Sequence, residues 1–143
     1  MKINRNALYG DELLVAVFAS FKKDERKFRI SNEGDIVNAL YEAKRTGEFE
    51  PLFENYPFDV DGFEPTSKQL MEGLDTLQQS SILGRMNPYL VDYSVSDAVD
   101  NRYEKFIQTK VLAQNKGQEM LAKLTEIVRS KLLGQSQIKH EPA

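Results

Sequence analysis

The strongest constraint on the fold of this 143-residue chain is a change in the spacing of its apolar residues between positions 66 and 95. Up to about residue 80 they recur at the three- and four-residue spacing of a helix, at Leu70, Met71, Leu74 and Leu77. Further on they alternate with polar residues, as in a half-buried strand, at Tyr89, Val91, Tyr93 and Val95. Between the two patterns lie Ile82-Leu83 and the turn signal Asn87-Pro88. The sequence therefore predicts a helix that leads directly into a β-hairpin, with Thr66 as the helix cap and Gln69 at the capping-box position.

Further helices are predicted on both sides of this unit. The first covers about residues 7–24, and the second covers about residues 31–47. Between them, Lys27–Ile30 alternates polar and apolar residues and predicts a short strand. After the hairpin, residues 97–133 carry two apolar stripes. The polar residues 114–118 separate these stripes, and we expect the helix to bend or break there.

The composition restricts the chemistry of the chain. It has no cysteine, and its one histidine is His140. These counts exclude a disulfide framework, a Cys/His zinc site, thiol chemistry and an ordered Ser-His-Asp triad. Asp59-Val60-Asp61-Gly62 resembles the start of a calcium loop, but the twelfth position holds Leu70 where a glutamate is needed. We therefore expect no catalytic residue, no metal site and no cofactor, in a protein that is not an enzyme.

Charge is distributed unevenly along the chain, although the net charge is only −3. Residues 31–95 carry twelve acidic and four basic residues, whereas both flanking segments are mildly basic. An acidic chain disfavours non-specific binding to nucleic acid, but the uneven distribution leaves room for a local basic face.

The apolar run Leu13–Phe21 does not have the features of a targeting segment. It is nine residues long, follows two acidic residues and is followed by charged residues rather than by a cleavage site. It is also too short to cross a bilayer. We expect no membrane association and a cytoplasmic protein, and the absence of cysteine is consistent with a reducing compartment.

The order of three helices and a β-hairpin resembles the winged helix-turn-helix of bacterial transcriptional regulators. The residues that carry the resemblance are the helical stripe, the segment Ile82-Leu83-Gly84-Arg85 and the segment from Tyr89 to Val95. It implies an α+β, mostly helical, winged-helix-like fold. In that family the helix before the hairpin reads DNA and the hairpin is the wing, so the implied function is a dimeric, non-catalytic DNA-binding regulator. We expect double-stranded DNA to contact Lys68, Gln69, Arg85, Lys22 and Lys23.

The resemblance also implies how the chain is divided. Residues 1–95 form the winged-helix-like domain, residues 96–133 form a helical extension and residues 134–143 form a disordered tail. In PadR-like regulators a C-terminal helix of this kind makes the dimer. The apolar residues expected at the homodimer interface are Tyr103, Ile107, Leu121, Leu124 and Val128. The alternative is that this helix packs against the chain's own body.

The segment 48–64 supports a second hypothesis about function. It contains six acidic residues, no basic residue and several aromatic residues, which in a loop usually pin the chain to a core. The candidate recognition helix itself carries Glu72 and Asp75, whose carboxylates repel phosphates. The alternative is a non-catalytic protein–protein interaction module with a winged-helix-like fold. It would meet a basic protein partner through Glu50, Glu54 and Asp61.

Overall fold

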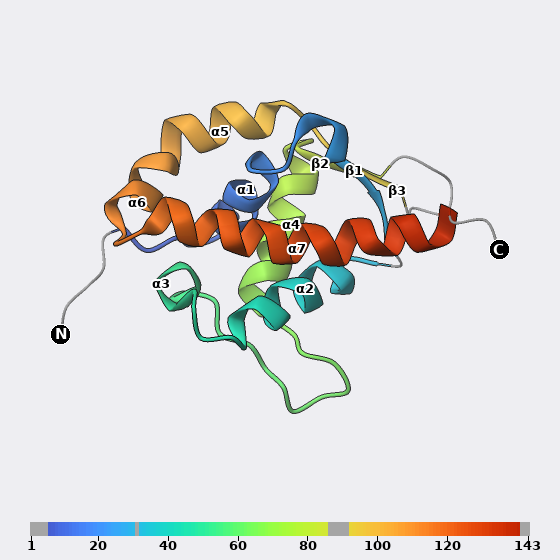
Figure 1. The fold of residues 1–143 in the computed structure, drawn as a ribbon, viewed down its shortest axis with the longest axis horizontal. Helices are drawn as coiled ribbons and strands as arrows, with labels where there is room; N and C mark the ends of the chain where they lie inside the picture. Colours follow the sequence, from blue (N-terminus) through green and yellow to red (C-terminus); the bar gives the residue numbers. More distant parts are fainter. Residues whose placement is uncertain (1–5, 31, 86–91, 141–143) are drawn as a thin grey trace.

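The computed structural model describes residues 6–30, 32–85 and 92–140 of the chain. Figure 1 shows a body of helices with a small sheet at its upper right edge. The elements in chain order are α1 (Glu12–Ala19), the 3₁₀ turn η1 (Lys23–Glu25), β1 (Lys27–Arg29), α2 (Gly34–Lys44), α3 (Glu50–Phe53), α4 (Lys68–Gln79), β2 (Leu83–Arg85), β3 (Asp92–Val95), α5 (Ala98–Phe106), α6 (Gln108–Ala113) and α7 (Gly117–His140). The predicted α+β, mostly helical class is confirmed.

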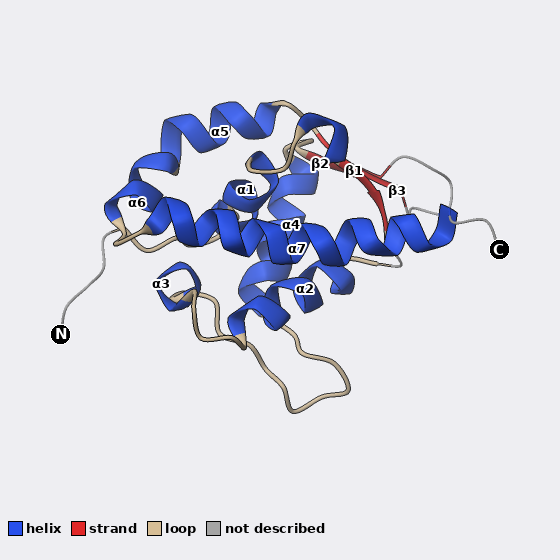
Figure 2. Ribbon diagram, in the orientation of Figure 1, coloured by secondary structure: helices blue, strands red, loops and turns tan. Residues whose placement is uncertain are grey.

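The three strands form one antiparallel sheet in the order β1-β3-β2, drawn in red in Figure 2. The central strand β3 places Tyr93 opposite Phe28 of β1 and Val95 opposite Leu83 of β2. The rings of Phe28 and Tyr93 are stacked with their centroids 6.0 Å apart, and both side chains are buried. The predicted hairpin pairing and the short first strand are confirmed. Outside the described residues lie the predicted strand and turn residues Tyr89, Val91 and Asn87-Pro88.

Helix α7 crosses the whole molecule in Figure 1 and packs against α1, α2, α6 and β1. Its inward side chains belong to the same hydrophobic core as those elements. The residues predicted at a dimer interface are all buried in this core of the single chain: Tyr103, Ile107, Leu121, Leu124 and Val128. They are not available to a second protomer, so their assignment is corrected: the stripes cover the chain's own body. Residues 1–95 and 96–133 accordingly share one core, and α7 continues to His140, past the predicted boundary at residue 133.

Helix α1 is shorter than the predicted range 7–24. Before it, Gly10 has a φ of +64°, in the left-handed region that favours glycine, so the chain turns there. After it, the guanidinium of Arg26 donates to the carbonyl oxygens of Ala19 at 3.0 Å and Phe21 at 3.3 Å. Ala19 is the last residue of α1, so its carbonyl has no partner within the helix, and Phe21 lies two residues beyond it. Arg26 therefore caps the C-terminus of α1 from outside the helix.

The N-cap of α4 is Ser67 and not the predicted Thr66. The Ser67 hydroxyl accepts a hydrogen bond from the backbone N–H of Leu70 at 3.2 Å. The backbone of Thr66 instead pairs with that of Asp59, through N···O distances of 2.8 and 2.9 Å. This pairing closes the loop of residues 59–66 at its base, directly before α4.

Gly73 allows α4 to pack closely against the start of α1. A Cβ at this position would lie 2.9 Å from the carbonyl oxygen of Gly10 and 3.2 Å from the Cα of Asp11. We expect Gly73→Ala to lower the free energy of unfolding by about 1–3 kcal/mol. The backbones of α1 and α4 must move apart to make room for the Cβ, and this costs more free energy than the higher helix propensity of alanine provides. Urea unfolding measures the change. The control is Gly134→Ala in α7, whose Cβ would meet nothing within 4 Å. A Gly73→Ala protein as stable as the wild type would contradict the close packing.

Candidate functional site

The first part of the acidic aromatic segment is fixed to the helical core. Its aromatic residues up to position 56 are buried: Phe49, Phe53 and Tyr56. The Tyr56 hydroxyl donates to the carbonyl oxygen of Gly10 at 3.0 Å and accepts from the N–H of Leu13 at 3.3 Å. Burial raises the pKa of Tyr56, so the hydroxyl stays protonated and keeps donating. The prediction that aromatic residues pin this segment to the core is confirmed for this part.

The second part, residues 59–66, extends away from the helices as the long loop at the lower edge of Figure 1. Phe63 on this loop is fully exposed, and the side chain of Val60 is 55% exposed. The carboxylates of Asp61 and Glu64 are exposed beside them. A large apolar side chain that is exposed to water would gain free energy of burial by contact with another apolar surface. The loop thus presents an apolar anchor among acidic groups.

A groove lies between this loop, the start of α2 and α4, and we call it the α2–α4 groove. Its volume is ≈ 350 Å³, and its lining residues are Asn32, Glu33, Gly34, Val37, Glu64, Pro65, Thr66 and Met71. The apolar part of the lining comes from Val37, Pro65 and Met71. Two of the lining residues carry carboxylates and none is basic. Gln78 of α4 donates to Glu33 Oε1 at 2.6 Å and orients that carboxylate.

The exposed face of α4 is also acidic. Lys68 Nζ lies 4.0 Å from Glu72 Oε1, one helical turn away, so its positive charge is locally matched. Asp75 adds a second exposed carboxylate to this face, and Gln69 is half-buried. The helix that the resemblance assigns to DNA reading therefore presents a negative surface rather than a positive one.

The structure does not bring the predicted DNA-contacting residues together. Lys22 and Lys23 are exposed at the start of η1, which follows α1, whereas Lys68 is the exposed first residue of α4. Lys23 Nζ lies 4.0 Å from Asp97 Oδ2, so acidic groups interrupt the basic cluster. Arg85 is a strand residue paired with Tyr93, and its side chain lies outside the described part of the structure.

The predicted partner-contacting residues are exposed but lie in two places. Glu50 and Glu54 belong to the short helix α3 or its end, whereas Asp61 lies on the projecting loop. Figure 1 shows α3 and that loop on different sides of the lower half of the molecule. The single acidic surface predicted from the sequence is therefore divided, and only the loop part adjoins the α2–α4 groove.

Sequence reasoning missed the groove residues outside the acidic aromatic segment. Met71 is predicted in the buried stripe of its helix, but its side chain is 36% exposed and lines the groove. Its position directly after Leu70, at the edge of the stripe, is the signal that could have identified it. Glu33 precedes α2 and is brought to Glu64 only by the packing of α2 beside α4. No local pattern reports that contact.

The described residues contain neither a metal site nor a membrane-spanning helix. They contain no group of three or more His, Cys, Asp or Glu residues positioned to hold a metal ion. No helix among residues 6–30, 32–85 and 92–140 combines the length and apolarity needed to span a membrane. Comparison of the chain with protein-family models, curated proteins and solved structures gives no match.

Proposed function

We propose that this chain is a non-catalytic interaction module of winged-helix type that binds a basic segment of a partner protein. The site is the α2–α4 groove together with the loop of residues 59–66. The observation that carries the proposal is the combination, at one place, of exposed apolar groups with carboxylates and no basic side chain.

The topology supports the winged-helix part of the proposal. The elements follow the order helix, strand, helix, helix, hairpin, with α3 and the projecting loop inserted between α2 and α4. The third helix α4 leads directly into a hairpin whose second strand is the centre of the sheet. In the winged helix-turn-helix the helix before the hairpin is the ligand-reading element, and here that helix forms one wall of the groove.

The charges favour a protein partner over DNA. Phosphate contacts supply most of the affinity for DNA, and they require lysine and arginine side chains. On α4 the exposed Lys68 is matched by Glu72, and Asp75 leaves the face negative. The adjoining groove adds the carboxylates of Glu33 and Glu64. A cationic protein segment is attracted to this surface, whereas a duplex is repelled by it.

The shape of the site defines the chemistry of the partner segment. A groove of ≈ 350 Å³ with an apolar wall has room for one or two large side chains. The flanking carboxylates are placed to meet arginine or lysine next to that anchor, through charge-assisted hydrogen bonds. The exposed side chain of Phe63 would pack against an apolar surface of the partner. The expected ligand is therefore a short segment that alternates apolar and basic residues.

An array of immobilised short peptides that combine leucine or phenylalanine with arginine tests this function. We expect the wild-type protein to bind such peptides and not their counterparts with glutamate in place of arginine. Phe63→Ala should weaken binding by about tenfold or more, roughly 1.4 kcal/mol, because it removes an apolar anchor. The double variant Asp61→Lys/Glu64→Lys should do the same by charge reversal.

Two matched variants control for non-specific effects. Glu48→Lys/Glu119→Lys makes the same change in net charge at exposed positions outside the groove, and we expect less than about a twofold effect. Leu112→Ala removes an exposed apolar side chain of α6 and should not affect binding. Equal losses in both charge-reversed proteins would show that net charge alone attracts the peptides. Binding to no member of the array would overturn the proposal.

DNA binding is the second candidate function, and the order of the strands and helices favours it. Capture of fragmented genomic duplex DNA at near-physiological salt tests it. Recovery of discrete fragments that are lost at higher salt, and lost in an Arg85→Glu variant, would establish a regulator. We expect recovery at background level, because the α4 face is acidic.

A further inference from the structure

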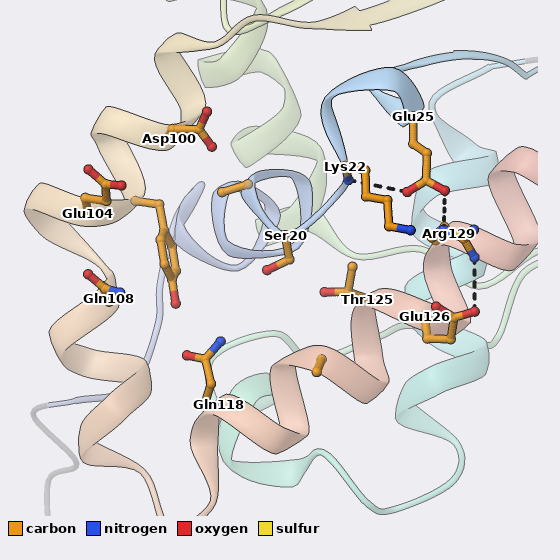
Figure 3. A pocket seen from close by; sticks show the side chains of 13 residues that line it. Ser20, Lys22, Glu25, Asp100, Glu104, Gln108, Gln118, Thr125, Glu126 and Arg129 are labelled. Carbon is orange, nitrogen blue, oxygen red and sulfur yellow. Dashed lines mark hydrogen bonds and ion pairs between the residues drawn. The ribbon is translucent and has the colours of Figure 1, made fainter.

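A second concave site lies on the opposite part of the core from the α2–α4 groove, between α5 and α7. Figure 3 shows Asp100, Glu104 and Gln108 along one side and Gln118, Thr125 and Arg129 along the other, with Ser20 at the end of α1 between them. The pocket has a volume of ≈ 600 Å³. This volume lies in the range of sites that hold small molecules.

Two buried hydroxyl groups belong to the lining of this pocket and have no hydrogen-bond partner. They are Tyr103 Oη and Thr125 Oγ1, on residues that are 9% and 5% exposed. Within the described residues, no other buried side-chain nitrogen or oxygen lacks a partner. Buried polar groups are nearly always satisfied, so an unsatisfied pair at one pocket requires an explanation. A ligand group or an ordered water in the pocket supplies one.

Burial keeps the Tyr103 hydroxyl in its neutral form. Desolvation raises the pKa of Tyr103 above its ordinary value. At neutral pH this hydroxyl can therefore both donate and accept a hydrogen bond, as can that of Thr125. Carboxylate oxygens, amides and hydroxyl groups are suitable partners for such a pair. A purely apolar ligand is not, because it would leave both oxygens unsatisfied.

The charges around the pocket further restrict the chemical class of the ligand. Asp100 is held by Arg26 at 2.7 Å, and Arg129 is held by Glu25 and Glu126 at 2.6 and 3.0 Å. Lys22 and Glu104 also line the pocket, and neither forms an ion pair with another described residue. Figure 3 shows them on different sides, Glu104 on α5 and Lys22 near Thr125 and Arg129. The pocket therefore offers one positive and one negative group, each still free to meet a ligand charge.

We propose that this pocket binds a small ω-amino acid, a zwitterion whose carboxylate and ammonium group lie at opposite ends of its chain. An α-amino acid carries both groups on one carbon and cannot reach the two sides of the pocket at once. The carboxylate of the ω-amino acid faces Lys22, its ammonium group faces Glu104, and its polar groups satisfy the hydroxyls of Tyr103 and Thr125. Both hydroxyl oxygens are covered in the unliganded chain, so binding requires the long side chains of the lining, such as those of Gln108 and Gln118, to move aside. The site is separate from the α2–α4 groove and does not depend on the function proposed for it.

A panel of free ω-amino acids of increasing chain length at millimolar concentration tests the proposal, with binding followed by two-dimensional NMR and by the shift in melting temperature. We expect at least one member to raise the melting temperature and to move the amide signals of α5 and α7. Tyr103→Phe and Thr125→Val should each weaken that ligand by about five- to tenfold, the effect of one lost hydrogen bond. Lys22→Met and Glu104→Gln should weaken it as well, because each removes one ligand-facing charge.

The stability of the unliganded variants gives an independent readout. Removing an unsatisfied buried hydroxyl removes a desolvation penalty, so Tyr103→Phe and Thr125→Val should leave the melting temperature unchanged or raise it. The matched control is Tyr56→Phe, which removes a buried hydroxyl that has two partners outside the pocket. It should lower the melting temperature and leave ligand affinity unchanged.

Three outcomes would overturn the proposal. If no ω-amino acid shifts the spectrum or the melting temperature, the pocket does not bind this class of ligand. If neutral polyols such as glycerol or glucose bind and amino acids do not, the two charges play no part. If Tyr103→Phe destabilises the free protein as much as Tyr56→Phe, its hydroxyl is satisfied within the fold and does not need a ligand.

Discussion

Replacing Leu124 by alanine is expected to lower the free energy of unfolding by about 2–5 kcal/mol. Leu124 lies on α7, and its side chain is completely buried in the core that α7 shares with α1, α2 and β1. The substitution removes apolar area from the core and leaves a cavity that the surrounding helices fill only in part. Urea unfolding followed by circular dichroism measures the loss.

The same experiment decides what α7 packs against. Leu112→Ala is the control, because this leucine is 59% exposed on α6 and should contribute less than about 0.5 kcal/mol. Unfolding is repeated at two protein concentrations. If Leu124 contributes to the core of one chain, the midpoint is independent of concentration. A midpoint that rises with concentration in the wild type but not in Leu124→Ala would restore the dimer-interface assignment.

Replacing Arg26 by methionine is expected to lower the free energy of unfolding by about 3 kcal/mol. The Arg26 side chain is only 6% exposed and donates to both carboxylate oxygens of Asp100, at 2.7 and 2.9 Å. It also caps α1 through the carbonyl oxygens of Ala19 and Phe21. Methionine fills much of the same volume but leaves these acceptors without a donor. Arg26→Lys should recover little of the lost stability, because one ammonium group cannot make the several hydrogen bonds of the planar guanidinium group.

The pH dependence of stability provides a second readout for Arg26. The hydrogen bonds from Arg26 lower the pKa of Asp100 below its ordinary value of 3.8. The pair therefore stabilises the fold fully above that value, and its contribution is lost as the pH falls through the lower pKa of the folded state. We expect the acid-side loss of stability to be less steep in Arg26→Met than in the wild type.

The matched control for both measurements is Arg29→Met. Arg29 and Asp92 also form a short ion pair, at 2.6 Å, but their side chains are 39% and 33% exposed. Solvent screens such a pair, so its removal should lower stability much less than the removal of Arg26 does. A loss for Arg26→Met no larger than that of Arg29→Met would contradict the structural role assigned to Arg26.

Local patterns in the sequence were sufficient to predict the elements whose formation depends on neighbouring residues. The stripe Leu70, Leu74 and Leu77 predicts α4, and the alternation that includes Tyr93 and Val95 predicts its hairpin partner. The break at residues 114–118 is likewise confirmed between α6 and α7. In each case the apolar period and the turn residues agree on one local structure.

Features that depend on distant contacts could not be predicted in this way. The stripe containing Leu121 and Leu124 shows that this face is buried, but not whether the covering surface belongs to the same chain. The early end of α1 depends on Arg26, whose carboxylate partner Asp100 lies much later in the chain. A charged residue in a charged stretch carries no signal of such a pairing, and the surface interpretation is the more frequent one.

The candidate site shows the same division. Its acidic loop could be identified from composition, because Asp61 and Glu64 lie in a segment without basic residues. The wall formed by Glu33 and Met71 could not, since three separate segments meet there only after α2 and α4 have packed. The split between Glu50 and Asp61 has the same origin, because the buried Tyr56 between them fixes the chain to α1.

The position of α7 in the chain also determines when this protein can fold during its synthesis. The buried leucines of α7 up to Leu132 complete a core whose other walls are made much earlier, at α1, α2 and β1. A nascent chain that has left the ribosome only as far as α6 exposes those apolar walls to water and lacks the helix that covers them. Folding must therefore wait until nearly all of the described chain has emerged, and until then the apolar surfaces of α1 and α2 are open to chaperones.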